Sequence, residues 1–242
     1  MTGIMMNVMN NVRSTYQPVT SSLVYYIDAG NVSSYSGTGS SINNIAGTAP
    51  GASTTNGSPT FTSAGQSSYF TFNGSTQYIL TANLIGQSLS SNITIECWVN
   101  TSTDNGVVVT EQGNLPVNTG WHDSQIEIVA GNLEVATWEY TIGAGGTVVG
   151  PVTRNVWQQY TLTQNATTTT GYINGSTTAS TAHVRTFGAA GLYYGIMLGD
   201  TTSLGDGSYL AGNWSILKVY NRALTQAEVQ QNYDSIKGRY GL

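Results

Sequence analysis

The C-terminal end of this chain constrains its fold more than any other segment does. Residues 212–220 alternate apolar and polar side chains, which is the pattern of a half-buried β-strand. Soon after it, Thr225 and Glu228 have the spacing of a capping box, in which each side chain satisfies a backbone N–H of the first helical turn. Apolar residues then recur at helical spacing from Val229 to Ile236. The sequence therefore predicts a strand followed by a short amphipathic helix that packs through one face.

The two ends of this predicted helix carry further signals. Leu224 and Val229 are placed to form a hydrophobic staple across the first turn. Lys237 would complement the negative end of the helix dipole, and Gly238 can adopt the left-handed conformation that stops a helix. We therefore expect the helix to stop at Gly238.

The rest of the chain reads as short strands separated by Gly- and Asn-rich turns, for example at Asn73-Gly74. Several short strands with such turns favour a sandwich or a barrel. The predicted strands lie near residues 23–28, 69–73, 77–80, 92–100, 107–111, 125–130, 133–140, 157–164, 171–179 and 194–198.

Several of these segments match family motifs: LVYYIDAGN at 23–31, FTFNGSTQYI at 70–79, NITIECWVN at 92–100, WQQYTLTQ at 157–164 and YING at 172–175. With the closing segment they resemble the laminin-G-like, concanavalin A-like jelly-roll family. The closing match comprises Gly212, Ile216, Val219, Tyr220, Asn221, Arg222, Ala223, Leu224, Thr225, Glu228 and Val229.

This resemblance spans roughly residues 22–238 in one register, so it implies a single domain. We expect an all-β fold, an antiparallel two-sheet jelly-roll sandwich with a short C-terminal α-helix. Because both ends carry family strand motifs, the resemblance also implies that the strands near residues 23–28 and 212–220 are close neighbours. The domain would occupy residues 21–242 and follow an N-terminal arm, residues 1–20. Family members often carry an acidic pair where this chain has Ser215, Leu217 and Lys218, so no role of those acids transfers.

The predicted arm is rich in Met and Asn and is bounded by Pro18. It is either a disordered terminus or a segment that orders on a neighbouring subunit, and the sequence leaves both open. Met1–Asn11 lacks the basic start and apolar core of a signal peptide, and no stretch has the length of a membrane helix. We therefore expect the chain to fold in the cytosol.

Charge limits the partners of this chain. Charged residues make up 8% of the sequence, the formal net charge is −5, and Lys and Arg do not cluster. Nucleic acids and acidic membranes therefore lack the electrostatic term that attracts them. The single cysteine, Cys97, excludes an internal disulfide, and its apolar surroundings predict a small buried hydrophobe rather than a nucleophile.

Catalysis is not expected. Glycoside hydrolases of this fold need two carboxylates that flank the scissile bond, and the laminarinase-like run E-x-D-x-x-E is missing. The nearest acids are Glu127, Glu134 and Glu139; the last two are five apart, so a regular strand would place them on opposite faces. Glu96 lies in an apolar strand and must be exposed or paired, with Arg222 or Arg154 as the expected partner.

Two groups of residues could bind ligands. Trp121, His122, Asp123 and Tyr140 combine aromatic faces with polar groups, as carbohydrate sites do, whereas Trp138 and Trp157 are interpreted as core aromatics. The loop at 199–207 brings Asp200 and Asp206 together, and hard oxygen ligands suit calcium, the one candidate cofactor. His122 and His183 share no Cys/His cluster, so zinc is not indicated.

Three functions follow from these observations. The ending NYDSIKGRYGL is similar to that of jelly-roll proteins in tailed-phage virions. The leading hypothesis is a non-enzymatic bacteriophage virion protein (capsid decoration, fibre or tail-associated) that contacts other virion proteins and copies of itself. The alternative is a glycan-binding module that contacts host surface glycans, either on the same particle or apart from it. The fold hosts all three classes of protein, so it does not decide between them. A glycoside hydrolase ranks last because the acid motif is missing.

Overall fold

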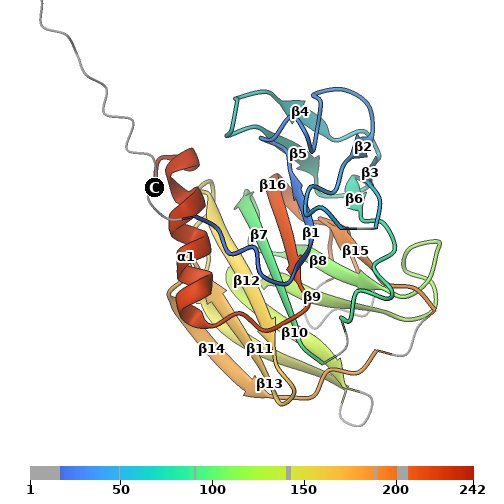
Figure 1. Ribbon diagram of the computed structural model, residues 1–242, viewed down its shortest axis with the longest axis vertical. Coiled ribbons are helices and arrows are strands. Elements are labelled where there is room, and N and C mark those ends of the chain that lie inside the picture. Colours follow the sequence, from blue (N-terminus) through green and yellow to red (C-terminus); the bar gives the residue numbers. More distant parts are fainter. Residues whose placement is uncertain (1–16, 49, 90, 140–142, 188–189, 201–206) are drawn as a thin grey trace, which may run out of the picture.

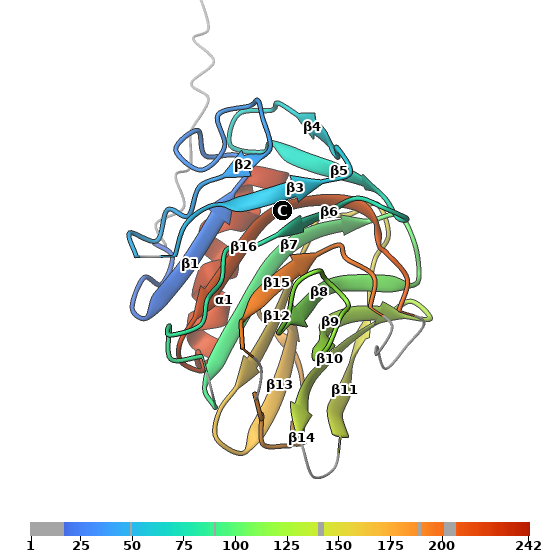
Figure 2. The same ribbon diagram turned by 90° about the vertical axis from the view of Figure 1, so that its right-hand side faces the viewer.

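The computed structural model describes residues 17–48, 50–89, 91–139, 143–187, 190–200 and 207–242. Its strands form two antiparallel sheets packed face to face, and one α-helix lies against the outer face of one sheet (Figures 1 and 2). The predicted fold, a two-sheet sandwich with a short C-terminal helix, is confirmed. No helix in the described part of the chain has both the length and the apolar character needed to span a membrane.

In the described part of the chain, each sheet has eight strands. Sheet A has the order β14-β13-β12-β7-β16-β5-β4, with β1 also paired to β16, and sheet B has the order β11-β10-β9-β8-β15-β6-β3-β2. The strands of sheet A are β1 (Leu23–Asp28), β4 (Thr60–Thr62), β5 (Tyr69–Asn73), β7 (Ile93–Thr101), β12 (Gln158–Gln164), β13 (Thr168–Ile173), β14 (Thr177–Ala182) and β16 (Ala211–Tyr220). Those of sheet B are β2 (Ser41–Ile42), β3 (Ser53–Asn56), β6 (Tyr78–Leu80), β8 (Gly106–Gln112), β9 (His122–Val129), β10 (Asn132–Glu139), β11 (Gly143–Pro151) and β15 (Tyr193–Ile196).

The main core lies between the two sheets. Alternate residues of β7, among them Ile95 and Cys97, meet Ile126 and Ile196 of sheet B in one buried cluster. Cys97 is fully buried, and burial raises the pKa of its thiol far above the ordinary value. Its interpretation as a small buried hydrophobe is therefore confirmed.

One edge of β16 is shared by two strands. β1 pairs with its second half, where Asp28 lies opposite Ile216, and β5 pairs with its first half, where Phe70 lies opposite Trp214. The predicted neighbourhood of the first and last strands is thus confirmed. Ser215 lies between the two pairings, and we call this interruption of the sheet edge the fork.

Helix α1 (Gln226–Ile236) begins as predicted. The Thr225 side chain accepts from the Glu228 N–H, and the Glu228 side chain accepts from the Thr225 N–H, so the capping box is complete. The staple residues Leu224 and Val229 belong to one buried cluster. Aromatic and aliphatic side chains on the outer face of sheet A cover the inner side of the helix.

The predicted helix stop at Gly238 is wrong. The chain continues from Lys237 to Tyr240 as a 3-10 helix, η1, and the left-handed residue is Gly241, with φ of 74°. Tyr240 stacks on Trp157 with ring centroids 4.4 Å apart. We attribute the continuation to this aromatic contact, which the helical pattern did not reveal.

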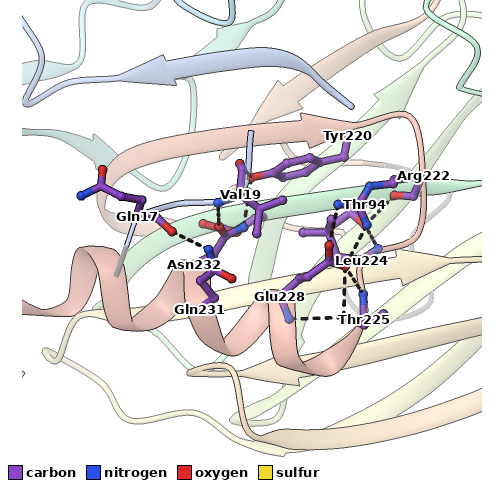
Figure 3. A network of polar contacts seen from close by, with 11 residues as sticks. Gln17, Val19, Thr94, Tyr220, Arg222, Leu224, Thr225, Glu228, Gln231 and Asn232 are labelled. Atoms are coloured by element: carbon purple, nitrogen blue, oxygen red, sulfur yellow. Dashed lines mark hydrogen bonds and ion pairs between the residues drawn. The ribbon is translucent and has the colours of Figure 1, made fainter. Parts of the chain in front are cut away.

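The segment before β1 is fixed to α1 (Figure 3). The Val19 N–H donates to Asn232 Oδ1 at 2.8 Å, and the Tyr220 hydroxyl donates to the Val19 carbonyl at 3.0 Å. Gln231 also donates to the Gln17 carbonyl at 2.7 Å. The base of the predicted arm is therefore anchored, while residues 1–16 lie outside the described residues.

The expected partner of Glu96 was wrong. Lys218 Nζ lies 3.0 Å from Glu96 Oε1, and Asn232 Nδ2 donates to Oε2 at 2.7 Å. Lys218 lies directly opposite Glu96 because β7 and β16 are neighbours in the sheet. Arg222 instead pairs with Glu228, and Arg154 pairs with Asp104.

Candidate functional site

The residues predicted to contact a glycan lie at the start of β9. His122 and Asp123 are its first two residues, and the Trp121 ring packs edge-on against Phe187 with centroids 5.0 Å apart. Tyr140 lies outside the described residues. Trp138 and Trp157 are both half-buried, and Trp157 packs outside sheet A rather than in the main core.

The structure joins this group to the predicted calcium loop. His122 Nε2 lies 3.6 Å from Asp200 Oδ1, and the Asp200 side chain is completely buried. Burial, followed by the charges of Asp200 and Glu127, raises the pKa of Asp123 to about 8. Asp123 therefore holds its proton at neutral pH. No sequence motif indicates this proximity, because Asp123 and Asp200 come from distant segments.

Binding at this cluster stays a prediction. Asp123 and Asp200 are each 1% exposed, so they offer a saccharide almost no contact surface. Among the described residues, no group of three or more His, Cys, Asp or Glu side chains is arranged to hold a metal ion. The calcium prediction also needs Asp206, which lies outside the described residues.

A second site, missed by sequence reasoning, lies at the fork. The loops that follow β1 and precede β5 leave the sheet there, at the end of the molecule that carries β2 to β4 (Figures 1 and 2). Together with η1 they enclose an open cavity of about 460 Å³, which we call the fork pocket. Its lining residues are Ala29, Gly30, Asn31, Val32, Tyr35, Ser36, Gly37, Phe61, Ser63, Gly65, Gln66, Ser68 and Arg239.

Close backbone packing builds the fork pocket in advance of any ligand. A Cβ atom on Gly30 would lie 2.1 Å from the carbonyl oxygen of Gln66, so only glycine lets the two loops approach this closely. The Ser215 hydroxyl donates to the Ser68 carbonyl at 2.8 Å, which ties the second loop to β16. The walls therefore need little ordering when a ligand binds.

Asp28 connects η1 to the first loop. It accepts hydrogen bonds from the Gly30 N–H at 2.8 Å, the Tyr26 hydroxyl at 2.8 Å and Arg239 Nη1 at 2.7 Å. Burial alone would lower the pKa of Arg239, but the charge and hydrogen bond of Asp28 raise it above its ordinary value. Arg239 therefore remains a cation at the pocket wall.

The pocket also has apolar surface. Phe61 is half-buried and packs against Tyr35, with ring centroids 4.8 Å apart, in an edge-to-face geometry. Val32, on the opposite loop, is 82% exposed. The amide groups of Asn31 and Gln66 line the same cavity. Aromatic, aliphatic and amide groups thus meet in one concave site.

Only a weak sequence signal could have indicated this site. The predicted strands near residues 23–28 and 69–73 leave a long connecting segment between them, but Gly30, Gln66 and Arg239 lie far apart in the sequence. Their meeting depends on the shared edge of β16 and on the continuation of the chain through η1.

Comparison with known families identifies the fold. A family model described as the concanavalin A-like lectin/glucanases superfamily matches residues 73–230. Comparison with curated proteins gives no match.

Solved structures give a consistent result. The binding domain of Paraclostridial Mosquitocidal Protein 1 superposes with a TM-score of 0.62 at 16% identity, covering 88% of this chain and 52% of that one. The binding domain of botulinum neurotoxin DC in complex with SialylT gives 0.63 at 13% identity, covering 90% and 52%. Domain 4 of AbnA, a GH43 extracellular arabinanase from Geobacillus stearothermophilus in complex with arabinotriose, gives 0.60 at 14% identity, covering 87% and 98%. The chain thus spans about half the length of the toxin domains and nearly all of the arabinanase domain.

Proposed function

The chain belongs to the concanavalin A-like lectin/glucanase superfamily, and from this premise we propose that it is a non-enzymatic module that binds a saccharide in the fork pocket. The observation that carries the proposal is the pocket itself, which is open, prebuilt and lined by both apolar and amide groups. Sugars present C–H faces between hydroxyl groups, so they suit a site of this mixed character.

The dimensions and the neighbours support this proposal. A cavity of about 460 Å³ falls within the usual size range of small-molecule sites. Two structures of the same fold hold arabinotriose and SialylT, although the identities of 14% and 13% extend the likeness to the fold alone.

The placement of the acids supports binding without hydrolysis. Glycoside hydrolysis needs two carboxylates on either side of the scissile bond. The residues that line the fork pocket in the described part of the chain include no carboxylate, and Asp28, which pairs with Arg239, is completely buried. The acids near Asp123 belong to a separate, buried cluster.

A glycan array followed by calorimetry tests this function. Gln66 is exposed and makes no side-chain hydrogen bond with the described residues, so Gln66→Ala should weaken binding several-fold without changing stability. Gln226→Ala makes the same chemical change at an exposed site on α1 and serves as the control. An array without any bound glycan, or equal affinities for both variants, would contradict the proposal.

A second candidate function is a structural component of a phage particle. The observation that favours it is the buried anchor at Val19, which fixes the start of the domain to α1 and gives the predicted arm a defined base. A weakly charged surface also lets copies pack without strong repulsion. Mass spectrometry of purified particles tests it, and absence of the chain from the particles would refute it.

A further inference from the structure

We propose that the fork pocket prefers a saccharide that carries a carboxylate, such as a uronic acid, over the corresponding neutral sugar. The inference rests on the proposed function and names the ligand class of the same site. It depends on how Arg239 is held at the pocket wall.

Arg239 presents a guanidinium group in a fixed orientation. Its Nη1 atom is held by Asp28 Oδ2 at 2.7 Å, and its side chain retains 19% exposure. A guanidinium has five N–H donors in one plane, so a second carboxylate can pair with an edge that Asp28 does not occupy. Because Arg239 also lines the pocket and its side chain is partly exposed, a ligand in the pocket would lie beside this side chain.

Asp28 orients this group without repelling a ligand at short range. Its side chain is completely buried and accepts from Gly30, Tyr26 and Arg239, so its charge is compensated inside the protein. The Asp28–Arg239 pair has no net charge, and we therefore expect selectivity from local hydrogen bonds rather than from long-range attraction. Bidentate guanidinium–carboxylate contacts combine strength with geometric specificity.

The remaining lining fits the rest of an acidic sugar. Among the lining residues that the structure describes, Arg239 is the only charged one, so a bound carboxylate meets no like charge in the wall. Phe61 and Val32 offer apolar surface for the ring, and Asn31 and Gln66 offer amides for its hydroxyl groups. A sugar ring and its carboxylate thus find separate partners.

Two methyl glycosides that differ at one carbon test the preference. Methyl β-glucuronide and methyl β-glucoside are titrated into the full chain at neutral pH, and amide shifts are followed by NMR. We expect the glucuronide to bind about tenfold more tightly, which equals about 1.4 kcal/mol, and to shift the Gly30 and Gly65 amides. Equal affinities would overturn the acidic preference and leave the proposed function standing, whereas binding of neither sugar would count against both.

Variants assign the preference to Arg239. Arg239→Lys keeps the charge but removes the planar fork, so the glucuronide should lose most of its advantage over the glucoside. Arg154→Lys is the matched control, because Arg154 forms an exposed ion pair with Asp104. Gln66→Glu is a second test that applies if Arg239→Lys does not fold. A carboxylate at that exposed wall position should selectively weaken binding of the glucuronide. The inference is refuted if the preference for the glucuronide persists in Gln66→Glu, or if it persists in Arg239→Lys when that variant is folded.

Discussion

At the level of single residues, two buried carboxylates are each compensated by specific partners. Lys218 and Glu96 are both almost completely buried and pair across neighbouring strands. Asn232 of α1 donates a hydrogen bond to the second carboxylate oxygen of Glu96. Asp28 has the same function at the fork, where it connects three separate donors. In both places a buried carboxylate is paired with a cation that is distant in sequence, so removing one member of the pair should cost far more than removing both.

The Lys218–Glu96 pair gives a direct test of this expectation. Lys218→Met should lower the free energy of unfolding by about 3–5 kcal/mol, because Glu96 then remains as an uncompensated buried charge. The double variant Lys218→Met/Glu96→Gln should recover a large part of that loss. Urea unfolding of the two single variants and the double variant measures the coupling, and additive losses would contradict it.

Asp123 predicts a dependence of stability on pH. Its pKa is raised to about 8 in the folded protein, against an ordinary value of 3.8. Between these values the folded state binds a proton that the unfolded state lacks, so this group stabilises the fold at low pH and the stabilisation is lost as pH rises towards 8. The free energy of unfolding should fall by up to about 1.4 kcal/mol per pH unit in that window.

Asp123→Asn should remove this slope, because the amide resembles the protonated acid and cannot ionise. Thermal unfolding across the pH range from about 4 to about 9 measures the effect. Asp104 is half-exposed, so Asp104→Asn serves as a control that should retain the wild-type dependence of unfolding on pH. Parallel curves for wild type and Asp123→Asn would show that Asp123 does not carry the dependence.

Among the elements, α1 and η1 do more than close the chain. Helix α1 covers the outer face of sheet A with Val229 and Ile236, and it holds the Val19 segment through Asn232. Through η1, the chain then reaches the fork and supplies Arg239. The stability of this C-terminal unit should therefore affect both the arm base and the pocket.

The capping box of α1 gives a prediction at this scale. Thr225→Ala should lower the free energy of unfolding by about 1 kcal/mol, because the Glu228 N–H loses the Thr225 hydroxyl as an acceptor. Thr225→Ser keeps the hydroxyl group and should retain most of the stability. Chemical unfolding measures both variants, and an unchanged midpoint for Thr225→Ala would contradict the capping argument.

At the scale of the whole molecule, the sandwich separates two kinds of site. The fork pocket is open and lies at the end that carries β2 to β4, whereas the cluster at the start of β9 is almost completely buried. The anchored segment at Gln17 and Val19 is a third feature, independent of both. Saccharide binding and assembly can therefore be tested separately.

Removal of residues 1–16 separates them. The truncated chain keeps every described contact of Val19, so we expect an unchanged melting temperature and unchanged saccharide affinity. If the arm contributes to assembly, incorporation into particles should fall. A deletion that starts the chain at residue 21 should in addition destabilise the fold, because it removes the buried Val19. Normal incorporation of the first truncation would refute a role for the arm.

The sequence alone determined the elements whose signals are local. Alternation of apolar residues predicted the strands, and the spacing of Thr225 and Glu228 predicted the start of α1. Motifs near both ends also predicted that β1 and β16 are neighbours. The strands and the helix start depend on hydrogen bonds and side-chain periodicity within a few residues, so a single chain segment contains the information. The pairing of β1 with β16 was instead implied by the family resemblance of the two ends.

Only the tertiary structure decided the pairings between distant segments. The partner of Glu96, the contact between His122 and Asp200, and the meeting of Gly30 with Gln66 depend on strand order and register. The continuation of α1 into η1 likewise brings Tyr240 onto the ring of Trp157, which lies far away in the sequence. Charge pairing and close packing act over a few ångströms in space, and the folded sheets determine which residues come within that distance.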